Sequence, residues 1–129
     1  MGTARKAAAA LTPAEQRAQT LEHLITLNMG LNNALDALEI ARDTAATPVA
    51  RQQAENEIPA IVQAKALLKN KTMAFIKKAP GSAISPPNQG IIDKTLKLSE
   101  DLGKVDAQTA KLQSVLSLAG RLVELVNSL

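Results

Sequence analysis

The chain has 129 residues and a formal net charge of +3, so its length suits one domain with a buried core. Apolar residues make up 46% of it, which excludes wholesale disorder, and the absence of cysteine excludes disulfide scaffolds, thiolate catalysis and cysteine-held metals. Aromatic residues make up only 1%, and alanine and leucine, both strong helix formers, dominate the apolar set. The composition therefore predicts an all-α fold.

Residues 1–11 are predicted to be a flexible tail, and the first helix is predicted over residues 13–45. Thr12 and Glu15 form the pattern of a capping box, with proline at the first helical position between them. Apolar residues then recur at alternating intervals of three and four, as in a bundle helix: Leu24, Leu27, Leu31, Ala34, Leu38, Ala41 and Ala45. Gly30 interrupts the helix formers, and we expect it to mark a close helix crossing.

The second helix is predicted over residues 48–79. Thr47 and Pro48 repeat the cap-and-proline start, and only a short turn separates this helix from the first, so we expect an antiparallel hairpin. Pro59 removes a backbone donor inside the helix and is expected to kink it. A complete break into two shorter helices is the alternative that the sequence leaves open.

A linker rich in proline and glycine covers residues 80–90, and the third helix is predicted over residues 91–127. Its first apolar seam has intervals of four and three: Leu98, Leu102, Val105, Thr109, Leu112, Leu116, Ala119, Val123 and Val126. Because the three predicted helices have similar lengths, we predict a single domain over residues 12–129. Its architecture is expected to be an up-down-up bundle of three long antiparallel helices.

A second apolar seam in the C-terminal half of the third helix is the first candidate binding surface. It consists of Val115, Leu118, Leu122, Leu125 and Leu129. We interpret this extra stripe as a contact for another protein or for a second copy of the chain. Burial inside the monomer is the alternative, because each helix of a three-helix bundle touches both others. Asn28 and Asn32, one turn apart beside the first-helix seam, could fix the register of an interface or could be ordinary surface residues.

A basic block in the second helix is the second candidate surface. It contains Lys65, Lys69, Lys71, Lys77 and Lys78, and no acidic residue occurs from Ile58 to Ile92. Such a block could contact the phosphates of nucleic acid, without regard to base sequence, or those of a membrane surface, or it could bind an acidic protein. A solvated helix end that suits the helix dipole is the alternative. The lack of aromatic stacking residues argues against nucleic acid.

Catalytic chemistry has little basis in the sequence. His23 is the only histidine, and neither cysteine nor a glycine-rich phosphate-binding pattern accompanies it. We therefore predict no enzymatic activity, no metal site and no other cofactor. Histidine phosphotransfer through His23 stays as an alternative, although the residues that follow it lack the pattern typical of phosphate-accepting helices.

Together these features favour a non-enzymatic helical-bundle module for protein–protein interaction, such as an adaptor, a chaperone or an assembly component. The expected partner is another protein or a second copy of the chain, with nucleic acid as the alternative. No apolar run approaches the roughly 20 residues that span a bilayer. We expect a cytoplasmic location, with secretion as an effector left open, and the alanine-rich composition suggests a bacterial source.

Overall fold

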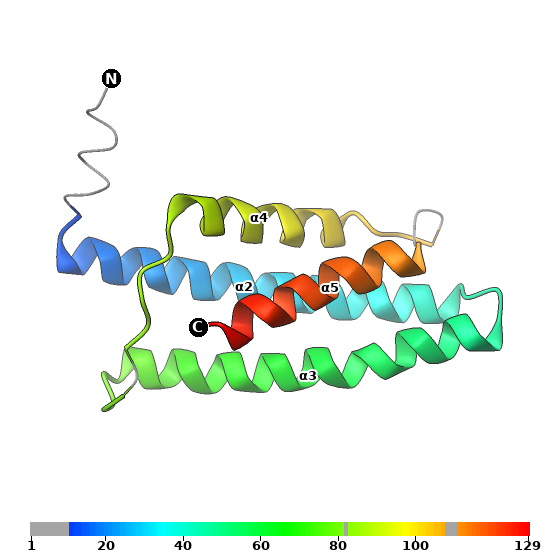
Figure 1. Cartoon of the computed structure of the whole chain (residues 1–129), viewed down its shortest axis with the longest axis horizontal. Coiled ribbons are helices and arrows are strands. Elements are labelled where there is room, and N and C mark those ends of the chain that lie inside the picture. The colour runs from blue at the N-terminus through cyan, green and yellow to red at the C-terminus, as the bar shows by residue number, and fades with distance from the viewer. Residues whose placement is uncertain (1–10, 82, 108–110) are drawn as a thin grey trace, which may run out of the picture.

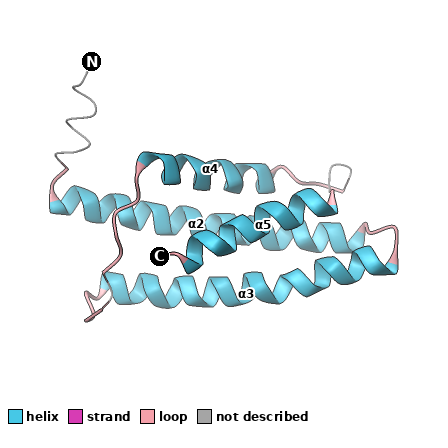
Figure 2. Cartoon of the chain, viewed as in Figure 1, coloured by secondary structure: helices cyan, strands magenta, loops and turns pink. Residues whose placement is uncertain are grey.

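The computed structural model describes residues 11–81, 83–107 and 111–129, and the regular structure of these residues is helical. The described elements are α2 (Pro13–Asp43), α3 (Pro48–Ile76), α4 (Gln89–Gly103) and α5 (Leu112–Asn127). Successive helices alternate in direction, with α4 and α5 lying along the hairpin of α2 and α3 (Figure 1). Loops connect them, and no strand occurs in the described ranges (Figure 2). The all-α prediction is thus confirmed for this part of the chain.

The first predicted helix is present as α2, and its start follows from local chemistry. The backbone N–H of Glu15 donates to the Thr12 hydroxyl at 3.1 Å, and the Thr12 N–H donates back to the Glu15 carboxylate at 3.3 Å. The predicted apolar seam is buried through six of its seven positions: Leu24, Leu27, Leu31, Ala34, Leu38 and Ala41. The helix ends at Asp43, two residues before the predicted end, because the chain turns there toward α3.

The second predicted helix is present as α3, and it passes through Pro59 without interruption. The alternative of a complete break is therefore not found, and Figure 1 shows the N-terminal part of α3 inclined to the rest. The helix ends at Ile76, before the predicted residue 79. Arg17 of α2 contributes to this end, because its guanidinium donates to the carbonyls of Phe75 and Ile76, each at 3.1 Å, and lies over the Phe75 ring.

The predicted third helix, residues 91–127, is wrong as a single element. The chain forms α4, stops at Gly103, and reverses into α5, so the bundle has a fourth helix within the described residues instead of a long third one. One local cause and one tertiary contact act at the break. Glycine is a weak helix former, and the Asn33 side chain donates to the Ser99 carbonyl at 3.0 Å, in the last turn of α4. A Cβ at position 103 would lie 3.1 Å from that Asn33 amide, so glycine permits its approach.

The reversal places α5 against the rest of the bundle. Both α2 and α5 contact each of the other three described helices. The inner face of α5 buries Val115, Ala119, Leu122 and Val126. These four residues come from both predicted seams, which explains why the sequence shows an arc wider than one seam. Thr109 of the first seam and residues 1–10 of the predicted tail lie outside the described residues.

Gly30 lies where α4 and α5 come closest to α2. A Cβ built at Gly30 would lie 3.1 Å from both δ-carbons of Leu122 and 3.5 Å from the Cβ of Ser99. Both distances are at or below ordinary carbon–carbon contact, so a hydrogen is the largest group that fits without movement. The predicted close helix crossing is confirmed, and it fixes how deeply α5 sits in the bundle.

Candidate protein-interaction groove

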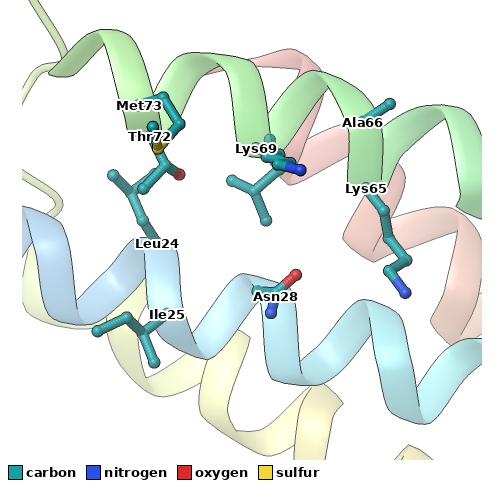
Figure 3. Close-up of a pocket in the computed structure, with 9 residues that line it drawn as sticks. Leu24, Ile25, Asn28, Lys65, Ala66, Lys69, Thr72 and Met73 are labelled. Carbon is teal, nitrogen blue, oxygen red and sulfur yellow. The ribbon is translucent and has the colours of Figure 1, made fainter. Parts of the chain in front are cut away.

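An apolar groove of about 420 Å³ runs between α2 and α3, on the side away from α4 (Figure 3). Its lining residues are Leu24, Ile25, Asn28, Lys65, Ala66, Leu68, Lys69, Thr72 and Met73. Leu24 and Leu68 form a buried floor that belongs to the core. Ile25 and Met73, by contrast, leave 60% and 45% of their surface exposed. The groove is therefore an apolar surface that is open to solvent and is backed by core residues.

The exposed apolar residues beside the groove share one face of α3. At 100° per residue, positions 62, 69, 73 and 76 fall within an arc of about 60° on an ideal helix. Val62, Met73 and Ile76 on this arc are exposed, and Ile25 and Met29 are exposed on α2. Apolar residues scattered singly on a surface need no explanation, but a shared face is typical of binding sites.

Lysines give this groove a positive rim. Lys65 reaches from α3 toward α2, on the side where Asn28 lies, and Lys69 follows one turn later (Figure 3). The lining set contains these two cations and no acidic residue. A ligand that combines apolar groups with negative charge therefore suits the groove better than a neutral or basic one.

The predicted lysine block is divided between faces. Lys65 and Lys69 border the α2–α3 groove, whereas Lys71 borders a different hollow and donates to the Leu129 carbonyl oxygen at 3.1 Å. Lys77 caps the end of α3, and Lys78 follows it with φ of 54°, in the left-handed region. The structure thus brings together two of the five lysines at a site and separates the others from them.

The predicted partner stripe on α5 is largely turned inward. Val115 and Leu122 are buried in the core of the chain itself. Leu118, Leu125 and Leu129 are half-buried and pack against that core. The stripe is therefore discontinuous as a surface, because its two buried members lie beneath α5.

Sequence reasoning identified Lys65 and Lys69 but missed the groove that they border. A signal was present, since Ile25 and Met29 are large apolar residues placed outside the predicted seam of the first helix. Asn28 also lines the groove, and Asn32 is half-buried one turn later. Recognising the groove required knowing which side of α2 faces α3 and which faces α4.

His23 is a buried residue, with 5% of its surface exposed. It lies beneath two hollows, one bordered by the linker at residues 83–88 and the end of α5, the other by Ile92 and Leu96 of α4. Its Nδ1 atom is buried and has no hydrogen-bond partner among the described residues. Burial lowers the pKa of His23 from the usual 6.5, because a charged imidazole is poorly solvated there.

We expect this histidine to make stability depend on pH. His23 takes up a proton near pH 6.5 in the unfolded chain but only at lower pH in the folded chain. Its contribution to the free energy of unfolding is therefore fully present above pH 6.5 and decreases as the pH drops below 6.5. The measurement is urea unfolding followed by far-ultraviolet circular dichroism between pH 7.5 and 5.5. His23→Gln, which cannot titrate, should lose most of this dependence, and an equal slope in both proteins would contradict the assignment.

No protein-family model matches the chain, and no match was found among curated proteins or solved structures. No helix in the described ranges is long and apolar enough to cross a membrane.

Proposed function

We propose that this chain is a non-enzymatic helical-bundle module that binds a protein partner through the α2–α3 groove. The observation that carries the proposal is the open apolar groove, whose lining combines the exposed Ile25 and Met73 with the buried Leu24 and Leu68. Exposing such residues costs solubility, and a partner that covers them recovers the apolar burial. An adaptor, a chaperone or an assembly component would work in this way.

The shape of the groove favours a helical partner segment. Two antiparallel helices leave a furrow between them that accepts the apolar face of a third helix, with anchors spaced three, four and seven residues apart. Lys65 and Lys69 lie one turn apart on the rim, so acidic residues flanking those anchors would find a cation within reach. The partner surface that fits is therefore apolar and acidic together.

The two alternative functions receive less support from the arrangement. Nucleic-acid binding uses a continuous basic surface, whereas Lys71 lies apart from Lys65 and Lys69 and bonds to the end of α5. Phosphotransfer uses an accessible imidazole, whereas His23 is buried. Neither alternative accounts for the exposed apolar residues of the groove.

The test compares groove variants with a variant on another face. A partner captured on the immobilised chain is purified and titrated against wild type, Ile25→Asp, Met73→Asp and Leu96→Asp. Leu96 is an exposed apolar residue of α4 outside the groove, which makes it a matched control. Each groove variant should weaken binding at least tenfold, or about 1.4 kcal/mol, as for a central interface residue, and Leu96→Asp should bind as wild type.

Because all three substituted residues are exposed, each variant should unfold at nearly the wild-type temperature. If no purified partner, including a second copy of the chain, loses affinity through the groove variants, the proposed function is wrong. Equal weakening by Leu96→Asp would show that the loss of binding is not specific to the groove and would contradict the proposal.

A further inference from the structure

Charge is distributed unevenly along the α2–α3 face. The groove end carries Lys65 and Lys69, with no acid in its lining. The opposite end, near the connection between the two helices, carries Glu39 and Glu55. Their charges, after the hydrogen bond and charge of Asp43, contribute to raising the pKa of Arg42, so these carboxylates gather around one point. One half of the face is therefore basic, and the other half holds three carboxylates, of Glu39, Asp43 and Glu55, against the two guanidinium groups of Arg42 and Arg51.

The two halves are related by regular spacing on α3. Glu55, Val62 and Lys69 follow one another at intervals of seven residues, which corresponds to about two helical turns and about 10.5 Å for each step. They therefore share one side of α3, within an arc of about 40° on an ideal helix, with an acid at one end, a base at the other and valine midway. Val62 is 51% exposed, so the midpoint of this side is open apolar surface.

The neighbouring helix repeats this arrangement around the same level. Since α2 and α3 are antiparallel, and Asn28 lies across the groove from Lys65 and Lys69, Asn32 lies about level with Val62. Seven residues beyond Asn32 is Glu39, at the carboxylate-rich end. The face thus has a centre at Asn32 and Val62, with two lysines on one side and a small excess of carboxylates over arginines on the other.

A face of this kind is complementary to itself after a two-fold rotation about an axis perpendicular to α3. We propose that the partner of the α2–α3 groove is a second copy of this chain. The two copies are related by a two-fold axis that lies in the interface, is perpendicular to α3 and passes beside Val62. This inference rests on the proposed function, since it names the protein that the groove binds. The interface is isologous, so each contact occurs twice.

In this dimer α3 packs antiparallel against the second copy's α3, so the two grooves face each other and each copy covers the exposed apolar residues of the other. Lys69 of each copy faces Glu55 of the other, and the two Val62 side chains meet at the axis. Glu55 already has an exposed ion pair with Arg51 at 3.4 Å, so Lys69 joins an existing pair across the interface. The parallel arrangement would instead set Lys69 against Lys69 and Glu55 against Glu55, and this like-charge contact disfavours it.

Charge reversal tests the pairing, with self-association of the full chain measured by sedimentation equilibrium from micromolar to millimolar concentration. Lys69→Glu and Glu55→Lys should each weaken self-association at least tenfold, because each places like charges opposite one another twice. The double variant should restore the wild-type constant. An equimolar mixture of the two single variants should also associate, because opposite charges again face each other. Circular dichroism confirms that each variant keeps its helices.

Cysteine cross-linking tests the position of the axis, and the chain contains no native cysteine to interfere. Val62→Cys should form a disulfide-linked dimer on oxidation, because a residue on the axis meets its own copy at disulfide distance. Val49→Cys, also exposed and on the same helix, should stay monomeric, because the antiparallel dimer carries it far from its own copy.

A strictly monomeric wild type, or a dimer insensitive to both charge reversals, overturns the second-copy inference. Cross-linking at residue 49 and not at residue 62 also overturns it. These outcomes leave the proposed function standing wherever a different purified partner loses affinity through Ile25→Asp and Met73→Asp. The failure of the inference and the failure of the proposed function are therefore separate results.

Discussion

Leu122→Ala is expected to lower the free energy of unfolding by about 2–5 kcal/mol, as for leucine truncations in well-packed cores. Leu122 is fully buried, and α5 reaches each of the other three described helices from this position. Its δ-carbons fill the space above Gly30, which has no side chain that could move into the vacated volume. The remaining cavity should place the loss in the upper half of that range.

The measurement is urea unfolding followed by far-ultraviolet circular dichroism, since the chain has no tryptophan or tyrosine for fluorescence. Leu96→Ala provides the control, because Leu96 is an exposed leucine on α4, and it should change stability by no more than about 0.5 kcal/mol. An unchanged unfolding midpoint in Leu122→Ala would mean that α5 does not pack here. The single long third helix predicted from the sequence would then regain its basis.

The first half of the fold could be predicted because its signals are local. Thr12 caps α2 through a residue three positions away, and the prolines that follow Thr12 and Thr47 fit the first helical position. The seam of α2 is buried from Leu24 to Ala41 because a single spacing rule places all of its residues on one side. Neither feature depends on contacts far along the chain.

The reversal after Gly103 could not be predicted from periodicity. The apolar spacing continues across the break from Leu102 to Leu112. The spacing therefore does not distinguish one long helix from two helices joined by a reversal. The contact that accompanies the break is the Asn33 amide on the Ser99 carbonyl, which joins residues 66 positions apart. Tertiary contacts of this kind override local helix preference, and sequence spacing does not report them.

The candidate site is likewise only partly predictable from the sequence. The charge pattern alone identifies Lys65 and Lys69, but the groove that they border also depends on Ile25, which stays exposed while α3, α4 and α5 cover other sides of α2. Conversely, the sequence predicts Leu122 on a partner surface, because an unbroken third helix has more apolar residues than a three-helix core needs. Because α5 folds back on the bundle, these apolar residues are buried within the chain, and exposed apolar surface lies at the groove instead.

Gly30→Val is expected to destabilise the chain by about 1–3 kcal/mol, although glycine is a weaker helix former than valine. A Cβ at position 30 already lies 3.1 Å from both δ-carbons of Leu122, and valine adds two further methyl groups at that contact. Leu122 is fully buried and Ser99 lies on the other side, so neither neighbour has open space into which it could move. The close crossing therefore decides the sign of the effect. The same urea titration measures it.

Gly120→Ala is the matched control within a helix. A Cβ at Gly120 meets nothing within 4 Å, so this substitution should stabilise the chain by about 0.5–1 kcal/mol through helix propensity alone. The contrast separates crowding at position 30 from a general response of helical glycines. Destabilisation by both substitutions would contradict the assignment of crowding to the α2–α5 crossing.

The two sites should also be coupled. When Gly30→Ala is made in the wild-type background, the gain in helix propensity is opposed by the 3.1 Å contact of the new Cβ with Leu122. In the Leu122→Ala background the contact is absent and the new methyl group lies over the cavity, so the same substitution should recover part of the lost stability. A double-mutant cycle should then give a favourable interaction energy of at least about 0.5 kcal/mol. Additive effects would show that α5 does not rest on Gly30, and that its depth in the bundle is set by other contacts.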